Sequence, residues 1–309
     1  MKSSAILLAL SSFARGQNPE DAIIRSGVAW TDTSGNRIYA GGANLYEENG
    51  TYYMIGEGKK VNQDLSECFN MYSSKDFTNW DFVGCMLKNE DIVVPPAFQN
   101  QTMYRMERPK VFKCPGDTSN TPYRMWFHCD TDNFSMRSVG VLTAPAITGP
   151  YTFVNACFRP DNLDSYDQGI YIDATGDNNA YHVRSVNNQY AGISQMDQLC
   201  LNTTGIVSQE GPRLEGPALM RSNGTLYLLG SHLTGWAPNP AQFVTTTSPT
   251  LNGANWTNNY NPTGDPTTYN SQSTFIFPFT HADGHVTYMY MGDRWNANGP
   301  GGLDNMTLI

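Results

Sequence analysis

The stretch RLEGPALMRSNGTLYLLGSHLTGW, residues 213–236, decides the fold. Two apolar segments flank Asn223-Gly224, a dipeptide that is typical of the tight turn of a β-hairpin. Glu215 stands at the start of the first segment, with apolar residues on both sides. Burying an unpaired charge is costly, so a carboxylate in this setting needs a partner or a function.

The same pattern of an apolar segment, a polar turn and an aromatic-rich segment occurs five times, starting at Gly41, Glu107, Asp167, Glu215 and Ser273. The starts are 66, 60, 48 and 58 residues apart, and a weaker second hairpin follows each of the first four. Units of about four strands at such a period are typical of a β-propeller. We therefore predict an all-β, five-bladed β-propeller. The alternative is a β-sandwich with irregular hairpins.

A propeller would bring three distant acids together. The first strand of each blade lines the central channel, so Glu107, Asp167 and Glu215, at the heads of three such strands, would face one funnel. Burial and like charges separate the pKa values of neighbouring acids, which lets one donate a proton while another stays ionised. This arrangement suits cleavage of a glycosidic bond. The alternative for any single acid is a structural role, capping backbone amides or pairing with an arginine.

The composition narrows the class of ligand. The 309 residues carry a net charge of -9 and a pI near 4.9, which argues against nucleic acid as a partner because a phosphate binder needs a basic face. A neutral sugar is compatible with this charge. No Cys-His cluster indicates a zinc site, so we predict no metal and no cofactor. No segment is long and apolar enough to span a membrane, and we expect a monomer.

The N-terminus, MKSSAILLALSSFARGQ (residues 1–17), has the layout of a secretory signal peptide, with a buried N-terminal strand as the alternative. We assign residues 18–309 to the propeller domain and expect a secreted, extracellular protein. An even count of six cysteines suits that compartment, and Cys68–Cys85 and Cys114–Cys129 are candidate pairs across predicted hairpins. Seven Asn-X-Ser/Thr sequons also suggest glycosylation: Asn49, Asn100, Asn133, Asn202, Asn223, Asn255 and Asn305.

Two tryptophans follow the hairpins of the last two units. Trp236 and Trp295 would lie where the loops meet the funnel, and sugars stack on such rings. The alternative for each is a place in the propeller core.

The segments ERPKV from Glu107, EGPALMRSNGTLYLLGSHLTGWAPNPA from Glu215 and GDRW (292–295) resemble glycoside hydrolase family 43, specifically its exo-β-1,3-galactanase subgroup. The resemblance extends from about residue 26 to 300, and it also implies a five-bladed propeller.

The resemblance implies a role for each candidate residue. It makes Glu215 the general acid, and Asp167, in SYDQG, the residue that tunes and orients that acid. Glu107 matches a glutamate that contacts substrate. The remaining sugar-binding candidates lie in similar segments: Glu57, Thr234 and Trp236.

The sequence departs from most of the family at the start of blade one. The aspartate that activates water there falls near Gly42 in AGGANLY, where no carboxylate is present. The subgroup shares this lack, and the resemblance makes Gln272, in NSQSTFIF, the substitute. A neutral amide is a poor proton acceptor, so Gln272 either orients water, acts through its imidic tautomer, or only binds sugar.

A second departure is the C-terminus, which ends at LDNMTLI where the family continues with an apolar strand. We therefore expect a last blade that lacks a strand, in a chain shortened at its C-terminus.

The leading hypothesis is a secreted, inverting exo-β-1,3-galactanase that acts on a polysaccharide, the β-1,3-galactan main chain of arabinogalactan. Two alternatives remain open. One is another family 43 activity, arabinofuranosidase or β-xylosidase, and the other is a non-catalytic sugar-binding propeller.

Overall fold

The computed structural model describes residues 22–60, 64–210, 214–235 and 237–294, and these residues form an all-β fold. The predicted signal peptide, Trp236, Trp295 and the sequon at Asn305 lie outside the described residues. Helical structure in the described residues is limited to short 3-10 turns: η2 (Asn89–Asp91), η3 (Pro96–Phe98), η4 (Pro160–Asn162) and η5 (Thr268–Asn270).

Four antiparallel sheets have four strands each, joined in chain order. The first contains β1 (Gly41–Glu48), β2 (Thr51–Glu57), β3 (Cys68–Ser74) and β4 (Asp81–Lys88). The second contains β5 (Arg105–Lys113), β6 (Tyr123–Asp130), β7 (Ser138–Ala144) and β8 (Thr152–Phe153). The third contains β9 (Gln168–Ile172), β10 (Ala180–Val186), β11 (Tyr190–Met196) and β12 (Thr203–Glu210). The fourth contains β13 (Glu215–Ser222), β14 (Thr225–Ser231), β15 (Gln242–Thr246) and β16 (Thr257–Tyr260).

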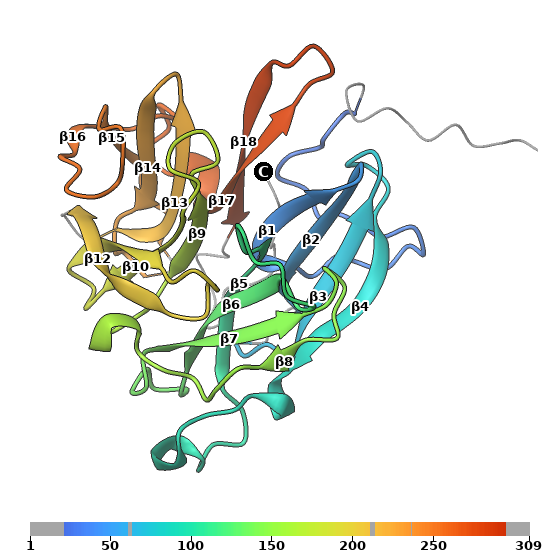
Figure 1. The fold of residues 1–309 in the computed structure, drawn as a ribbon. Coiled ribbons are helices and arrows are strands. Elements are labelled where there is room, and N and C mark those ends of the chain that lie inside the picture. The colour runs from blue at the N-terminus through green and yellow to red at the C-terminus, as the bar shows by residue number, and fades with distance from the viewer. Residues whose placement is uncertain (1–21, 61–63, 211–213, 236, 295–309) are drawn as a thin grey trace, which may run out of the picture.

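Within the part of the chain that the structure describes, the last sheet pairs two strands, β17 (Ser271–Thr280) and β18 (Val286–Arg294). It completes a ring, because β17 contacts both β13 of the fourth sheet and β1 of the first. The other inner strands also contact in turn, β1 with β5, β5 with β9 and β9 with β13 (Figure 1). The fold is therefore a β-propeller with four blades of four strands, and the predicted inner hairpins are confirmed.

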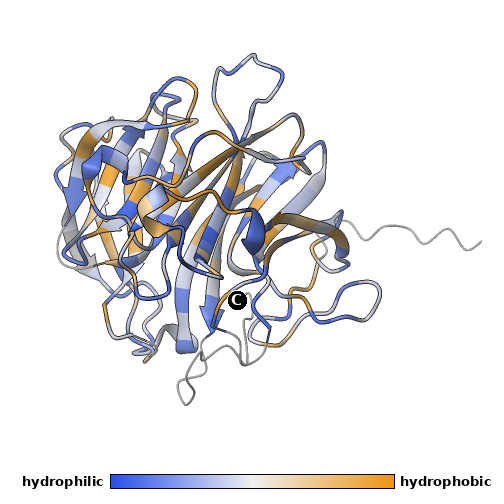
Figure 2. Cartoon of the chain, turned by 90° about the horizontal axis from the view of Figure 1, so that it is seen from below, coloured by the Kyte–Doolittle hydropathy of each residue, from blue (hydrophilic) through white to orange (hydrophobic). Residues whose placement is uncertain are grey.

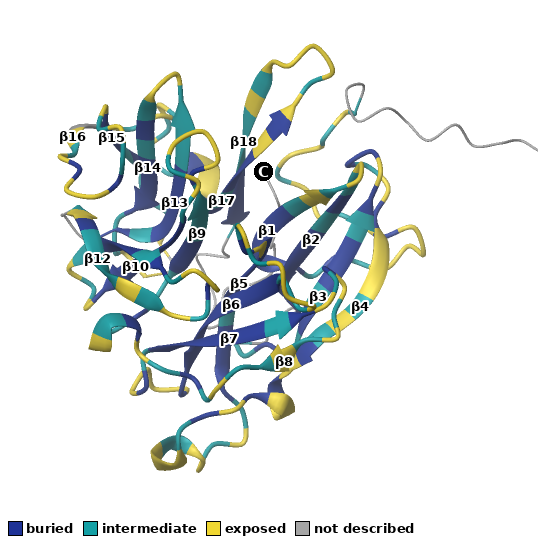
Figure 3. Ribbon diagram, viewed as in Figure 1, coloured by how far each residue is buried: buried dark blue, intermediate teal, exposed yellow. Residues whose placement is uncertain are grey.

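Each interface between neighbouring sheets has its own apolar cluster. Phe69 and Phe127 pack between the first two sheets, and Tyr52 and Phe277 pack between the last sheet and the first. Apolar residues recur along the strands in Figure 2. Burial is deepest inside the ring: every residue of β6 is buried, whereas the outer strand β4 is largely exposed (Figure 3). The hydrophobic effect thus closes the ring at the sheet interfaces.

Four inner strands, β1, β5, β13 and β17, carry a bulge within a few residues of their heads. At the bulges of β1, β5 and β13, the backbone of Gly42, Arg108 and Gly216 is left-handed, with φ of 58°, 50° and 58°. A bulge redirects the side chain beside it, and Glu107 and Glu215 each immediately precede one. Non-glycine residues rarely adopt positive φ, so Arg108 is strained.

All six cysteines form disulfides. Cys68–Cys85 joins β3 to β4, as predicted. The predicted Cys114–Cys129 pair is wrong, because Cys114 lies at the turn end of the β5–β6 hairpin while Cys129 faces Met106 near the other end. Cys114 instead bonds Cys200, and Cys129 bonds Cys157.

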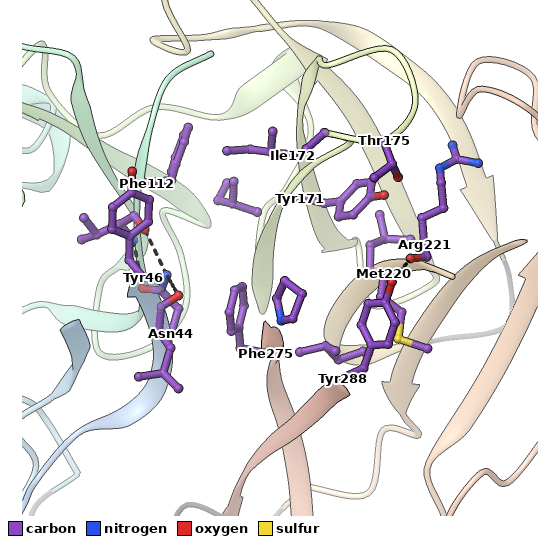
Figure 4. A pocket seen from close by; sticks show the side chains of 17 residues that line it. Asn44, Tyr46, Phe112, Tyr171, Ile172, Thr175, Met220, Arg221, Phe275 and Tyr288 are labelled. Carbon is purple, nitrogen blue, oxygen red and sulfur yellow. Dashed lines mark hydrogen bonds between the residues drawn. The ribbon is translucent and has the colours of Figure 1, made fainter. Parts of the chain in front are cut away.

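The inner strands leave an apolar cavity of about 240 Å³ away from their heads. Figure 4 shows aromatic side chains around it, among them Tyr46 from β1, Phe112 from β5 and Phe275 from β17. Channel-facing positions beyond the acidic heads are therefore largely apolar, and the polar groups gather at the other end.

Candidate active site

A polar cavity of about 400 Å³ lies where the inner strands begin. It contains five of the candidate residues: Glu57, Glu107, Asp167, Glu215 and Gln272. The cavity is also lined by residues that were not predicted: Lys59, Arg105, Arg108, His128, Phe134, Tyr166, Asn188 and Gly235. The three acids that the propeller was expected to bring together therefore share one cavity.

Glu215 is the first residue of β13 and faces Ser231 of β14 in the strand pair. Burial, and after it the negative charge of Asp167, raises the pKa of Glu215 to about 8 against the opposing effects of Arg108 and of the Gln272 side chain. A carboxyl group with this pKa is protonated at neutral pH. Glu215 is therefore able to donate a proton.

Asp167 immediately precedes β9 and has both carboxylate oxygens engaged. Oδ1 lies 2.7 Å from Arg108 Nε, and Oδ2 accepts a hydrogen bond from the backbone N–H of Gly216 at 3.0 Å. The second contact joins Asp167 to the residue after Glu215. It fixes the carboxylate next to the acid whose pKa it raises.

Gln272 is the second residue of β17 and lies between the acid and a cation. Its Nε2 donates to Ser231 Oγ at 2.9 Å and to Glu215 Oε2 at 3.5 Å. Its Oε1 accepts from Arg108 Nη2 at 2.5 Å. The amide is thus fixed at both ends.

Glu107 is held in a cluster of cations. Its carboxylate lies 3.2 Å from Lys59 Nζ, 3.0 Å from His128 Nδ1 and 3.6 Å from Arg105 Nη1. Burial alone would raise the pKa of Glu107, but Lys59, His128 and Arg105 hold it well below its usual value. Glu107 is therefore a charged acceptor suited to sugar hydroxyls.

His128 is itself a cation at neutral pH. Burial alone would lower its pKa, but its Nε2 lies 3.1 Å from Asp130 and its Nδ1 faces Glu107, and these two acids raise the pKa to about 9. Asp130 is fully buried and also accepts from two backbone amides. The result is a row of alternating charges that ends at the cavity.

Glu57, the last residue of β2, occupies the space beside the bulge of blade one. Its Oε1 accepts from the backbone N–H of Arg108 at 2.8 Å, and its Oε2 lies 2.7 Å from Lys59 Nζ. A side chain at Gly42 would place its Cβ 2.6 Å from Glu57 Oε1. Any side chain at Gly42 would therefore need Glu57 and Arg108 to move.

Comparison with solved structures finds exo-β-1,3-galactanases. The enzyme from Phanerochaete chrysosporium, solved with β-1,3-galactotriose, is 34% identical with a TM-score of 0.80, over 93% of this chain and 63% of that one. The enzyme from Clostridium thermocellum is 28% identical with a TM-score of 0.80, over 93% and 61%. A putative one from Bifidobacterium bifidum is 28% identical with a TM-score of 0.78, over 92% and 91%.

The chain is a relative of the exo-β-1,3-galactanases of glycoside hydrolase family 43. It spans less than two thirds of the length of the Phanerochaete and Clostridium enzymes. No family model matches the sequence, and no curated protein matches it.

The other candidate residues of the present chain do not line the cavity or lie outside the described residues. Thr234 lies on the loop after β14 and does not line the cavity, and its hydroxyl donates to Ala237 O at 2.5 Å and accepts from Asn239. Its role in sugar binding stays a prediction, as do those of Trp236 and Trp295. Phe134 provides a half-exposed ring at the cavity instead, with Arg105 over its face at 4.4 Å.

The cationic residues that line the cavity, among them Lys59, Arg108 and His128, were not predicted from the sequence. Arg108 belongs to the ERPKV motif, which the sequence analysis identified. Nothing in the local sequence shows that the Arg108 side chain reaches β17. Lys59 and His128 lie at the ends of second strands, opposite or just beyond the strand heads. Within the described ranges, no cluster of His, Cys, Asp or Glu could hold a metal ion, and no helix is long and apolar enough to cross a membrane.

Proposed function

We propose that the chain is a glycoside hydrolase that releases galactose from the end of β-1,3-galactan, the main chain of arabinogalactan. One observation carries this proposal: a protonated Glu215 faces a polar cavity in a chain that is 34% identical to an exo-β-1,3-galactanase over 93% of its length. That relative was solved with β-1,3-galactotriose and with galactose.

In this proposal, Glu215 protonates the leaving oxygen, and Asp167 orients Glu215 and raises its pKa. Glu107 and Glu57 bind sugar hydroxyls, and Gln272 completes the cavity wall beside the acid. Asp167 is a poor candidate for the nucleophile of a retaining enzyme, because Arg108 and Gly216 already bind both of its oxygens. This supports an inverting reaction, in which water attacks the sugar directly.

The remaining proposals concern the whole protein. We take β17 and β18 to be an incomplete fifth blade, since the sheet fills the fifth place in the ring. Residues 1–17 act as a signal peptide and 18–309 form a secreted, monomeric propeller domain. The three disulfides support an oxidising, extracellular location.

The test is incubation of the full-length protein with β-1,3-galactan, arabinan and xylan, followed by product analysis by proton NMR. We expect galactose from galactan, released as the α-anomer before mutarotation. Arabinose or xylose as the main product would refute the substrate in favour of another family 43 activity. Binding of galactan oligosaccharides without turnover would refute catalysis and leave a sugar-binding propeller.

A further inference from the structure

Arg108 joins three strands around the site while its side chain is 5% exposed. Its Nε lies 2.7 Å from Asp167, its Nη1 donates to the backbone oxygen of Ser273 at 2.9 Å, and its Nη2 donates to Gln272 Oε1 at 2.5 Å. Its backbone N–H is bound by Glu57. A buried charge on a strained backbone costs stability. The contacts of Arg108 tie this charge to residues of the site, which points to a functional role.

The guanidinium determines which way the Gln272 amide faces. Arginine carries only donors, so the atom of Gln272 that meets Nη2 must be the oxygen. The nitrogen then faces Ser231 Oγ at 2.9 Å and Glu215 Oε2 at 3.5 Å. Both acceptors receive an N–H, as the two protons of an amide nitrogen require. The orientation therefore follows from the chemistry of the neighbours.

The same contact disfavours the imidic tautomer of Gln272. That form places a proton on the oxygen and leaves a lone pair on the nitrogen as the proton acceptor. A hydroxyl oxygen is a poorer acceptor than an amide carbonyl oxygen, so protonating Oε1 would weaken the hydrogen bond that it accepts from Arg108 Nη2. A nitrogen lone pair at this position would also face the protonated Glu215, so it would accept the Glu215 proton in a hydrogen bond and would not be available to water.

We propose that Arg108 is a positioning residue that holds Gln272 in its amide form, so that Gln272 acts as a hydrogen-bond donor and does not take the proton from water. This inference rests on the proposed galactanase function and deepens it. The Nε2 contact to Glu215 is long, at 3.5 Å, so this N–H is available to a sugar oxygen once substrate enters. Gln272 then orients the sugar relative to the acid.

The kinetic test compares Gln272→Glu, Arg108→Lys and a control, Arg124→Lys, with the parent enzyme on β-1,3-galactan. A glutamate at 272 would pair with Arg108 and could not donate, so we expect kcat to fall by about 10²-fold or more. If Gln272 were the catalytic base, Gln272→Glu should keep or raise kcat, because a carboxylate accepts a proton far better than an amide does. A kcat for Gln272→Glu that equals or exceeds the parent value would overturn the proposal.

Arg108→Lys separates positioning from charge. The lysine keeps a cation near Glu215 but cannot contact Asp167, Ser273 and Gln272 together. We expect kcat to fall at least tenfold, while KM and the alkaline limb of the pH profile change little. Arg124 is equally buried, paired with Asp117 and remote from the cavity, so Arg124→Lys should lower Tm and leave kcat unchanged. A parent-like kcat for folded Arg108→Lys would contradict the positioning role.

A second measurement does not depend on activity. In protein labelled with ¹⁵N-glutamine, the side-chain signal that is missing in Gln272→Glu identifies Gln272. Two protons on this nitrogen support the amide form, and one or none overturns the proposal. If the parent releases no galactose, the proposed function fails while this spectrum still decides the form of Gln272.

Discussion

Replacing Glu215 with Gln should abolish galactan hydrolysis and leave the fold intact. The two side chains have nearly the same shape, and the one side-chain hydrogen bond of the Glu215 carboxyl group, from Gln272, is long at 3.5 Å. General acid catalysis contributes about 10²- to 10⁴-fold, which corresponds to about 3 to 5 kcal/mol of the barrier. We expect galactose release to fall by this factor.

The pH dependence follows from the same site. Glu215 must be protonated to donate, and burial together with the charge of Asp167 raises its pKa to about 8. We therefore expect kcat/KM to be level near neutrality and to fall tenfold per pH unit above about 8. Stability has the same sign: a raised carboxyl pKa favours the folded state at low pH and loses that effect as the pH rises through 8. The Tm of Glu215→Gln should therefore rise relative to that of the parent between about pH 4.5 and pH 8, and the difference should be constant above pH 8.

The decisive assay uses two leaving groups. Galactan needs protonation of its leaving oxygen, whereas a dinitrophenyl β-galactoside does not. Glu215→Gln should lose the first activity, retain much of the second and show no alkaline limb near pH 8 for it. If Glu215→Gln hydrolyses galactan at the parent rate, or if the parent's limb lies near pH 5, the reasoning about Glu215 is wrong.

Three further outcomes can be measured. Asp167→Asn removes the charge that raises the pKa of Glu215, so the alkaline limb should move to lower pH; a limb that moves upward contradicts this. Gly42→Asp should not supply a base, since a φ of 58° and the adjacent carboxylate oppose any side chain; we expect a loss of about 2 kcal/mol or more by urea unfolding, and faster galactose release would disprove it. Replacing Cys114 and Cys200 by alanine opens an 86-residue loop, and the chain-entropy model predicts a loss of about 4 to 5 kcal/mol, which a change below about 1 kcal/mol would refute.

The inner hairpins could be predicted because their signals are local. Asn49-Gly50 and Asn223-Gly224 both adopt positive φ, as a tight hairpin turn requires, and any sequence reader can see such a dipeptide. The turn sets the register of the hairpin, and a bulge between Glu215 and Ala218 shifts it before the head of β13. The turn eight residues away thus predicts the hairpin, but not the residue that faces Glu215.

The disulfides show where this reasoning ends. Cys68 and Cys85 sit on adjacent strands of one hairpin, so their pairing could be read from the sequence. Cys114 bonds Cys200 across 86 residues and between two sheets, and that contact depends on how the sheets pack around the ring. No local pattern contains this information.

Strand pairing accounts for one of the missed site residues, His128, which lies opposite Glu107. Each strand head is paired with a residue near the end of the second strand of its sheet: Gly41 with Glu57, Glu107 with His128, Glu215 with Ser231, and Gln272 with Asp293. In three of these four pairs the first strand brings an acid or an amide to the cavity, and in each pair the second strand places a hydrogen-bonding or charged side chain opposite the strand head. Three of these four partners are ionisable. A bulge shifts the register between the hairpin turn and each of these pairs, so the turn alone does not identify the partner of a strand head.

The same geometry accounts for the missing base. In blade one the head is a glycine, and its cross-strand partner supplies the carboxylate instead. In that carboxylate, Glu57, one oxygen is engaged by Lys59 and the other by the backbone N–H of Arg108. The carboxylate of blade one therefore helps to hold Arg108 in place. We therefore expect the attacking water to be positioned by the bound sugar together with Gln272, in the space beside Glu215.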